Sequence, residues 1–364
     1  MHNKVALFFQ SLARTGGGAE KQLIWLASSL KRSGFEVAVI TWDEPDATSF
    51  YTLPAGITWH KLGFRVGLPD KIRRTYQLAK LLRKEKIGTL VGFLAANNKV
   101  LIASGLIAGV KMVASERNSP QIYRIKYRTT GRWMAYLSLL AFDRITVQFE
   151  DFVAGYPRFL RRRIIFMPNP IFRVNGQANP GDQSKTLFKM LFVGRFERIQ
   201  KQPGLLIDAF HSIARHHQHW ELNMIGDGEE KNILENKIKK LGLEDRIKLL
   251  PSQPSIGDIY RQADLFVIPS LWEGSSNALC EAMAHGLPAV GFEVDGVKQL
   301  IKNNRSGWLC PTINATEFAK TLTIALRSKA LFKEFGKTAS ETAKTYSEDD
   351  ICQLWTKLLL SIER

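Results

Sequence analysis

Short runs of apolar residues alternate along the chain with longer segments in which apolar residues recur every three or four positions. The runs predict strands and the segments predict helices. In the first half, strands are predicted at residues 5–9, 35–41, 89–93, 111–115, 144–148 and 164–167, and helices at residues 19–32, 70–86, 97–107 and 121–140. Strands separated by helices indicate βαβ units and therefore a parallel sheet.

One polar stretch, residues 175–182, interrupts this alternation with the Asn, Gly and Pro residues typical of a linker. The alternation then resumes, with strands predicted at residues 190–193, 222–225, 247–250, 265–268 and 289–292 and helices at residues 204–215, 229–241, 256–262 and 277–284. A last amphipathic helix is predicted at residues 348–362.

The fold class predicted from this order is α/β, with two doubly wound Rossmann-like domains that face a cleft. Residues 1–174 and 187–345 would form the two domains, residues 175–186 the linker, and residues 346–364 a closing helix. A length of 364 residues is enough for two separate cores. Because ligands of such sheets bind beyond the carboxyl ends of the strands, we expect the site in that cleft.

Positive charge is concentrated in the first half of the chain. Residues 1–175 contain 27 Lys and Arg against 11 Asp and Glu, whereas residues 176–364 contain 24 against 23. A basic half can bind nucleic acid, anionic lipid or a phosphorylated substrate at a membrane surface. Three segments, residues 71–74, 124–128 and 158–163, mix cations with aromatic or aliphatic residues, which suits a membrane surface, although solvated helix faces show the same pattern. No nucleic-acid-binding motif accompanies the charge, so nucleic acid is not expected as a partner.

The expected location is cytoplasmic and peripheral at the inner face of the cell membrane. No apolar run reaches the roughly 18–20 residues that span a bilayer, and the N-terminal apolar run is too short for a secretion signal. The three cysteines, Cys280, Cys310 and Cys352, are odd in number and lack metal-ligand spacing, as expected of a reduced protein.

The candidate chemistry is concentrated in residues 269–288, PSLWEGSSNALCEAMAHGLP. Glu273 stands on a small-residue loop after a buried strand, and a helix predicted from Asn277 carries Glu281 about two turns along. The N–H groups at the helix mouth suit a phosphate, Glu273 could accept a hydrogen bond from a sugar hydroxyl, and Glu281 could reach a ribose diol. Taken alone, these glutamates are better explained as a capping carboxylate and a solvated side chain.

Other strand ends carry further candidates. Glycines at residues 16–18 open the first predicted helix and would allow close approach of an anion, although a plain turn explains them equally well. Arg195 and Lys201 flank a loop and together suit a diphosphate, although two solvated cations fit equally well. Asp227, between two glycines, is more typical of a turn than of a metal site.

Taken together, these motifs resemble the retaining nucleotide-sugar glycosyltransferases of family 4, which have the two-domain GT-B architecture. The resemblance covers nearly the full chain, and its most specific part is the spacing of the two glutamates with the tail that follows. The residues that carry it are 17–20 (GGAE), 194–196 (GRF), Lys201, 226–228 (GDG), 269–270 (PS), 273–274 (EG), 281–288 (EAMAHGLP), Gly296 and Gly307.

The resemblance implies roles for these residues. Arg195 and Lys201 would hold the donor diphosphate of a UDP-sugar, and Glu273 would contact the transferred sugar, so these three form the expected catalytic group. The remaining donor-binding residues would be Gly17, Gly18, Gly226, Gly274, Ser275, Ser276, Asn277 and Glu281. No cofactor and no metal ion are expected, because fixed cations and a helix end stabilise the departing charge.

Residues 115–118 (SERN) resemble the signature of a subgroup that builds lipid-linked glycans and bacterial surface polysaccharides. Glu116, Arg117 and Asn118 would face the acceptor or the donor sugar, although a Glu–Arg ion pair in a loop is an equal explanation. Asn97 is only a weak substitute for a His that many members carry nearby. Lys201 lies six residues after Arg195, where the family commonly has five, which we interpret as one inserted loop residue.

We therefore predict a retaining glycosyltransferase that moves a hexose or N-acetylhexosamine from a UDP-sugar to a lipid-diphosphate-linked saccharide in exopolysaccharide, capsule or O-antigen biosynthesis. Retention is expected through same-face attack assisted by the leaving phosphate, because no carboxylate is obviously placed as a nucleophile. The alternatives are an epimerase or hydrolase of the same fold and, further away, a non-enzymatic basic binder of nucleic acid or membrane.

Overall fold

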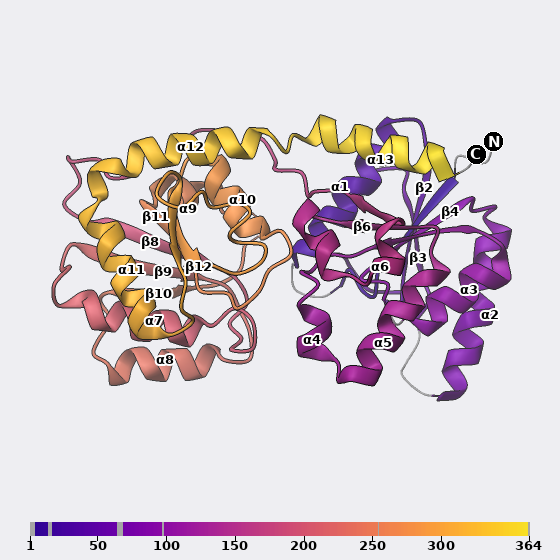
Figure 1. Cartoon of the computed structure of the whole chain (residues 1–364), viewed down its shortest axis with the longest axis horizontal. Coiled ribbons are helices and arrows are strands. Elements are labelled where there is room, and N and C mark those ends of the chain that lie inside the picture. The colour runs from indigo at the N-terminus through magenta and orange to yellow at the C-terminus, as the bar shows by residue number, and fades with distance from the viewer. Residues whose placement is uncertain (1–3, 14–16, 64–67, 97, 254, 363–364) are drawn as a thin grey trace. The chain divides into compact units, whose positions relative to one another are not determined.

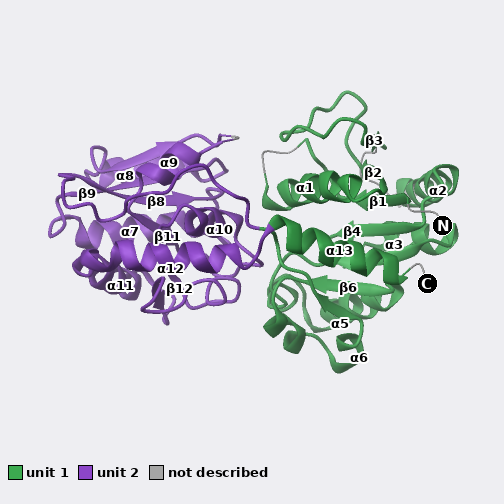
Figure 2. Cartoon of the chain, turned by 90° about the horizontal axis from the view of Figure 1, so that it is seen from above, with its two compact units in different colours: residues 1–170, 348–364 green, residues 171–347 purple. Residues whose placement is uncertain are grey.

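The computed structural model describes residues 4–13, 17–63, 68–96, 98–253 and 255–362. The chain divides into two compact units, which are described separately (Figure 2). Unit 1 comprises residues 1–170 and 348–364, and unit 2 comprises residues 171–347. Each unit contains one sheet of parallel strands surrounded by helices (Figure 1), which confirms the predicted α/β class with two doubly wound domains.

The sheet of unit 1 has the strand order β3-β2-β1-β4-β5-β6-β7, so the direction of winding reverses between β1 and β4. Its strands are β1 (Lys4–Phe8), β2 (Glu36–Thr41), β3 (Thr58–Lys61), β4 (Thr89–Phe93), β5 (Lys111–Ser115), β6 (Arg144–Val147) and β7 (Ile164–Phe166). The central strands are buried on both faces, as continuous apolar runs in a parallel sheet should be, and Val5, Ala6 and Leu7 have no exposed surface.

The helices of unit 1 include the last segment of the chain. They are α1 (Gly18–Arg32), α2 (Leu68–Lys84), α3 (Lys99–Ala108), α4 (Ile122–Lys126), α5 (Thr129–Ser138), α6 (Arg158–Arg161) and α13 (Glu348–Ile362), with 3-10 turns η1 (Leu139–Ala141) and η2 (Glu150–Gly155). Helix α13 lies beside α1, and Trp25 Nε1 donates a hydrogen bond of 3.0 Å to Glu348 Oε1. The apolar face predicted for residues 348–362 is therefore buried in unit 1, with Trp355 only 1% exposed.

The sheet of unit 2 has the order β10-β9-β8-β11-β12-β13 and reverses between β8 and β11. Its strands are β8 (Phe188–Val193), β9 (Trp220–Ile225), β10 (Ile247–Leu250), β11 (Leu265–Ile268), β12 (Ala289–Phe292) and β13 (Gly307–Cys310). Its helices are α7 (Pro203–Ala214), α8 (Lys231–Lys240), α9 (Gly257–Gln262), α10 (Asn277–Ala284), α11 (Ala315–Arg327) and α12 (Phe332–Lys344), with a 3-10 turn η3 (Lys329–Leu331).

Some elements differ from the predicted ones. The pattern does not predict the edge strands β3 and β13, nor α6, α11 and α12. The single helix predicted at residues 121–140 is wrong, because Tyr127 and Arg128 adopt extended backbone (ψ 138° and 165°) and divide it into α4 and α5. This break lets Tyr123 of α4 pack against Tyr136 of α5, with ring centroids 4.9 Å apart.

The stretch predicted as a linker, residues 175–186, lies within unit 2 instead. Ala178 N–H donates to the His285 carbonyl (2.8 Å), and Gly181 N–H donates to the buried carboxylate of Asp264 (3.0 Å). Polar, Gly-containing sequence is thus used here to satisfy a buried acceptor rather than to separate domains. The chain passes between the units at residues 170–171 and again at residues 347–348.

Within the described part of the chain, no helix has both the length and the apolar character required to cross a bilayer.

Candidate functional site

The donor-side residues predicted in unit 2 follow the two strands at which that sheet reverses. Strands β8 and β11 pair in parallel, with Leu265 opposite Met190 and Phe266 opposite Leu191. Their carboxyl ends therefore lie at the same edge of the sheet. The loop after β8 carries Arg195 and Lys201, and the loop after β11 carries Glu273, so the topology places two separate motifs side by side.

Lys201 and Glu273 form an ion pair in which Nζ lies 2.5 Å from Oε1. Both side chains are largely buried, with 17% and 7% of their surface exposed. Gln200 supports the pair, because its Nε2 donates to the Trp272 carbonyl at 2.8 Å and lies 3.5 Å from Glu273 Oε2. Lys201 is thus fixed at the sheet edge by Glu273, with which it was grouped in the expected catalytic set.

The loop that carries Lys201 wraps around the carboxylate of Glu197. This carboxylate accepts hydrogen bonds from the backbone N–H groups of Ile199 (2.9 Å), Gln200 (3.1 Å) and Lys201 (3.0 Å). Gln202 then adopts the left-handed conformation, with φ 53°, immediately before α7. Sequence reasoning missed Glu197 and Gln200, although a carboxylate two residues after the Gly-Arg pair was a signal that it could cap the loop.

Arg195 differs from Lys201, because its side chain is exposed and forms no hydrogen bond or ion pair with another described residue. It follows Gly194, and a Cβ placed on Gly194 would lie 3.5 Å from Lys201 Cδ. The Lys201 side chain therefore passes over the strand end that presents Arg195. This leaves one neutralised cation and one free cation at the same edge.

Gly226 has a structural role that the prediction did not assign to it. A Cβ at this position would lie 2.0 Å from the Gly194 carbonyl oxygen, so only a glycine lets the ends of β8 and β9 approach each other. The neighbouring Asp227 accepts a hydrogen bond from Gly228 N–H at 2.9 Å, as a turn-forming Asp does.

Helix α10 begins beside this edge, with predicted donor-binding residues at its mouth. Ser276 is the N-cap, and its hydroxyl accepts a hydrogen bond from Leu279 N–H at 3.4 Å. Ser275 Oγ lies 3.7 Å from Cys280 Sγ. Burial raises the pKa of the Cys280 thiol to about 12, against the hydrogen bond with Ser275, so this cysteine is no nucleophile at neutral pH.

The loop after β12 contacts the backbone of Glu273 and Gly274. Glu273 N–H donates to the Asp295 carbonyl at 3.0 Å. Gly296 has φ +80°, and a Cβ there would lie 2.2 Å from the Gly274 carbonyl oxygen. Glycine is therefore required at this position both by conformation and by space.

Glu281 is held further along α10. Tyr260 donates a hydrogen bond of 3.0 Å to Glu281 Oε2, and the His285 ring stacks on Tyr260 with centroids 5.0 Å apart. Burial lowers the pKa of His285, so its imidazole is neutral at pH 7. Asn277 is the first residue of α10, and Gly274 lies in the loop before its N-cap.

The acceptor-side motif lies in unit 1, after β5. Glu116 is buried, and Tyr123 donates a hydrogen bond of 2.5 Å to its Oε2. Burial raises the pKa of Glu116, against the hydrogen bond from Tyr123, which favours the charged form. Asn118 is half-buried at the end of the loop.

Arg117 and Glu116 do not form an ion pair among the described residues. Arg117 Nη1 donates to Asn169 Oδ1 at 2.7 Å, and the guanidinium lies 4.8 Å from the Phe93 ring and 5.8 Å from the Trp355 ring of α13. The ion pair considered as a purely structural explanation of the motif is therefore absent from this loop.

The remaining predicted residues also belong to unit 1. Gly17 is the N-cap of α1 and Gly18 its first residue. A Cβ on Gly17 would lie 2.1 Å from Glu20 Oε2, because the Glu20 side chain folds back over the beginning of the helix. Asn97 lies outside the described residues.

Comparison with known proteins gives a consistent result. The sequence profile of the family described as "Glycosyl transferases group 1" matches residues 177–342. An uncharacterized glycosyltransferase of Haemophilus influenzae is 24% identical, over 98% of this chain and 99% of that protein. A Campylobacter jejuni enzyme named GalNAc-alpha-(1->4)-GalNAc-alpha-(1->3)-diNAcBac-PP-undecaprenol alpha-1,4-N-acetyl-D-galactosaminyltransferase is also 24% identical, over 95% of this chain and 96% of that enzyme.

The fold is similar to that of Anabaena HepE, solved in complex with UDP and glucose, with a TM-score of 0.80, 19% identity and coverage of 98% and 99% of the two chains. The two parallel sheets described above correspond to the GT-B architecture of these structures. The chain is therefore a glycosyltransferase with the GT-B fold, and its second half is a glycosyl transferases group 1 domain.

Proposed function

We propose that the chain transfers a hexose or N-acetylhexosamine from a UDP-sugar to a lipid-diphosphate-linked saccharide, with retention of configuration and without a metal ion. The product would enter the synthesis of a surface polysaccharide, with the protein peripheral at the inner face of the cell membrane. The Campylobacter relative supports the acceptor class, because its name specifies an undecaprenol-diphosphate-linked saccharide. HepE, solved with UDP, supports the donor class.

The observation that carries this proposal is the group of charges at the carboxyl ends of β8 and β11. A diphosphate leaving group gains negative charge as the glycosidic bond breaks. Free Arg195, fixed Lys201 and the N-terminus of α10 can stabilise that charge without reorganisation, which is the most effective form of electrostatic catalysis. Glu273, held by Lys201 and by the Asp295 carbonyl, would contact the sugar, and Glu281 the ribose.

The direct test is a thermal-shift experiment with UDP, GDP, ADP and CMP. A ligand at 100 times its Kd adds about 2.7 kcal/mol to the free energy of unfolding, and each kcal/mol raises the Tm of a unit of this size by about 2–4 °C. We expect a rise with UDP that Arg195→Ala abolishes. The exposed Arg198 of the same loop gives the matched control, and Arg198→Ala should keep the shift.

Absence of a UDP shift in the wild-type protein would contradict the proposed donor. With UDP binding established, transfer would be assayed with UDP-sugars and a lipid-diphosphate-linked N-acetylhexosamine. Release of free sugar without any acceptor would favour a hydrolase of the same fold.

A further inference from the structure

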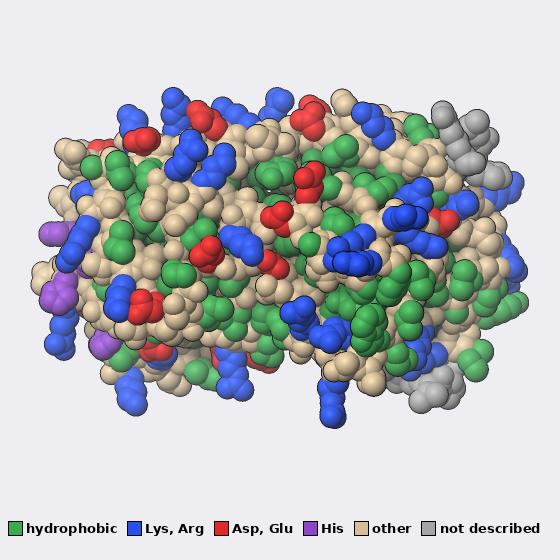
Figure 3. All heavy atoms as spheres, in the orientation of Figure 1, with side chains coloured by type: hydrophobic (Ala, Val, Ile, Leu, Met, Phe, Trp, Pro, Cys, Tyr) green, Lys and Arg blue, Asp and Glu red, His purple; other side chains and the backbone are tan. Residues whose placement is uncertain are grey.

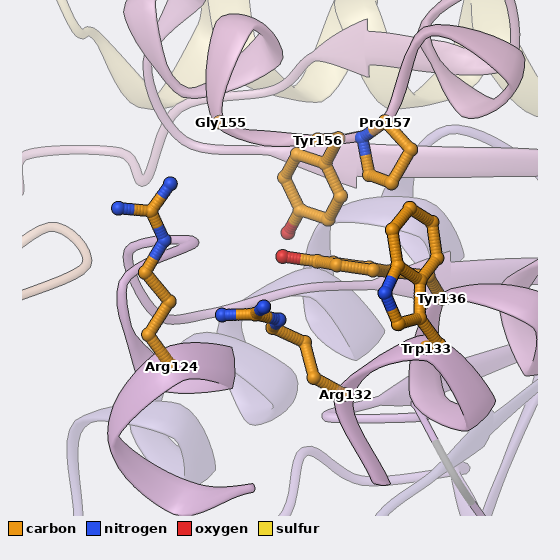
Figure 4. Close-up of a pocket in the computed structure, with 7 residues that line it drawn as sticks. All are labelled: Arg124, Arg132, Trp133, Tyr136, Gly155, Tyr156 and Pro157. Carbon is orange, nitrogen blue, oxygen red and sulfur yellow. The ribbon is translucent and has the colours of Figure 1, made fainter. Parts of the chain in front are cut away.

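Unit 1 contains a pocket of about 380 Å³ that the donor and acceptor motifs do not use. It is lined by Arg124, Arg132, Trp133, Tyr136 and Tyr156, and is completed by Gly155 and Pro157 (Figure 4). We call it the arginine–tyrosine pocket. It exists because the helix predicted at residues 121–140 breaks, so that α4 and α5 present their side chains to one space.

The pocket contains positive charge that nothing in the described chain neutralises. Neither Arg124 nor Arg132 forms a hydrogen bond or ion pair through its guanidinium with another described residue, and no carboxylate lines the pocket. Burial raises the pKa of Tyr136, and the positive charges of Arg132 and Arg124 act in the opposite direction, as expected of cations close to the phenol. Glu116, which also acts on Tyr156, is already hydrogen-bonded to Tyr123.

A second observation points independently to a ligand. The Tyr156 side chain is buried, with 2% exposure. Its hydroxyl is near that of Tyr123, which already donates to Glu116, but it meets the geometry of a hydrogen bond with no described residue. In Figure 4 the hydroxyl groups of Tyr156 and Tyr136 point into the pocket, on the same side as the two guanidinium groups. An unpaired buried hydroxyl lowers stability, and a ligand oxygen in this space would provide its partner.

These donors define the class of ligand. Two guanidinium groups and a phenolic O–H bind oxyanions, and a pair of arginines balances two negative charges. A diphosphate that links a lipid to a sugar carries two, whereas a phosphodiester headgroup carries one. The charge of the pocket therefore favours a diphosphate.

Helices α4, α5 and α6 also carry exposed apolar side chains, of which Trp133 lines the pocket. Ile125 of α4, Trp133, Met134 and Leu137 of α5, and Phe159 of α6 are between 45% and 54% exposed. In the view of Figure 3, hydrophobic side chains lie next to Lys and Arg side chains over the region of α4 and α5. Exposed apolar side chains beside cations are typical of a surface that enters the headgroup region of an anionic membrane.

We infer that the arginine–tyrosine pocket binds the diphosphate of the lipid-linked acceptor while the exposed apolar side chains of α4, α5 and α6 lie in the membrane interface. The inference rests on the proposed function, because it assumes an acceptor of that class. It adds Arg124, Arg132, Tyr136 and Tyr156 as acceptor-binding residues and Trp133 as a membrane contact.

The test is flotation of the protein with neutral phosphatidylcholine vesicles that contain polyprenyl-diphosphate-linked N-acetylglucosamine. Control vesicles contain phosphatidylglycerol in place of the diphosphate lipid, at the same surface charge. They separate recognition of the diphosphate from general electrostatic attraction. We expect at least tenfold tighter binding to the diphosphate vesicles, and loss of that preference in an Arg124→Ala, Arg132→Ala variant, since one charge-assisted hydrogen bond is worth about tenfold. The control is Arg158→Ala, Arg162→Ala, which removes two exposed cations of unit 1 that do not line the pocket.

Equal binding of the wild-type protein to both vesicle types would overturn the inference, as would equal losses in the two variants. Tyr156→Phe provides an independent test. Because its hydroxyl has no partner in the free protein, the variant should keep or raise the Tm while binding diphosphate vesicles several-fold less tightly. A lowered Tm with unchanged vesicle binding would instead identify the hydroxyl as structural.

The UDP thermal shift separates this inference from the proposed function. The pocket variants should retain the shift, because their substitutions lie in unit 1 and the nucleotide is proposed to bind unit 2. A wild-type protein that shows the UDP shift but no preference for the diphosphate vesicles would overturn the inference and leave the proposed donor in place. An absent UDP shift would count against the proposed donor and not against the pocket.

Discussion

The two units hold their candidate polar groups in opposite ways. In unit 2, Lys201 and Glu273 pair with each other, and Glu197 is saturated by backbone N–H groups. In unit 1, the Tyr156 hydroxyl, Arg117 Nε and Gln148 Oε1 are buried without hydrogen-bond partners. Unit 2 also contains such atoms, Asn223 Oδ1 and Ser270 Oγ, but the Lys201–Glu273 pair and Glu197 at its candidate site are satisfied before any ligand binds. The unpaired groups of unit 1 lower stability by an amount that a bound ligand would restore. Substitutions should reveal this difference as loss of stability in unit 2 and little loss, or a gain, in unit 1.

The largest effect is expected for Lys201→Ala. It leaves Glu273 as a buried charge without its cation, which typically costs about 3–5 kcal/mol, and it removes a proposed transition-state contact worth about 10²–10³ in kcat. Differential scanning calorimetry and a transfer assay measure the two losses. Lys237→Ala, which breaks the more exposed pair with Asp208, should cost at most about 1 kcal/mol.

The double variant Lys201→Ala, Glu273→Ala sharpens this prediction. With both charges removed, much of the lost stability should return, while transfer activity should not. Recovery of activity together with stability would show that the pair only supports the fold, and would break the contrast drawn between the units.

A smaller effect is expected for Gly296→Ala, which tests the backbone support of Glu273. Alanine at a left-handed position costs about 1–2 kcal/mol, and a Cβ only 2.2 Å from the Gly274 carbonyl adds about 1–3 kcal/mol more. Gly242→Ala is the matched control, because Gly242 also has positive φ (+64°) but has nothing within 4 Å of its Cβ. Equal Tm losses in the two variants would show that Gly296 does not support the Glu273 loop.

The smallest effect, and one of opposite sign, is expected for Glu116→Gln in unit 1. Because burial raises the pKa of Glu116 above its ordinary value of 4.5, the folded state holds this proton more tightly than the unfolded state. The wild-type protein therefore loses stability as the pH rises from about 4.5 through the folded pKa, and the variant avoids that loss. We expect the variant to be more stable by roughly 1 kcal/mol at pH 7–8, with the difference vanishing below pH 4.5.

Urea unfolding across this pH range measures the difference, and Glu150→Gln, at an exposed position in unit 1, serves as the control. A variant that is less stable at pH 7 would show that Glu116 is a structural group. Reduced transfer by a stabilised variant would support its placement at the acceptor.

The sequence predicts the central strands of both sheets better than the elements at their edges, for physical reasons. Strand β11, helix α10 and strand β12 have the predicted bounds, because buried apolar runs alternate there with an amphipathic helix and clear turns. Strand β3 (TWHK) escapes prediction because it is short, lies at an edge and is incompletely buried. The break between α4 and α5 escapes prediction because the contact of Tyr123 with Tyr136 that accompanies it joins two helices, and no local pattern contains such a contact.

The candidate site is likewise predictable only in part. Motif order alone indicates Lys201 and Glu273, but not that they pair, because they lie 72 residues apart and meet only through the pairing of β8 with β11. Glu197, Gln200 and the arginine–tyrosine pocket depend on loop and helix geometry that the periodicity of the sequence does not encode.

Unit 2 is inserted within unit 1, since α13 returns to α1 through Trp25 and Glu348 and brings Trp355 near Arg117. During synthesis, the chain of unit 2 is made before α13. Unit 1 therefore lacks the helix that packs against α1 until all of unit 2 has been synthesised. A chain that ended before residue 348 would contain all of unit 2 and a unit 1 without α13, so completion of unit 1 depends on this 15-residue helix.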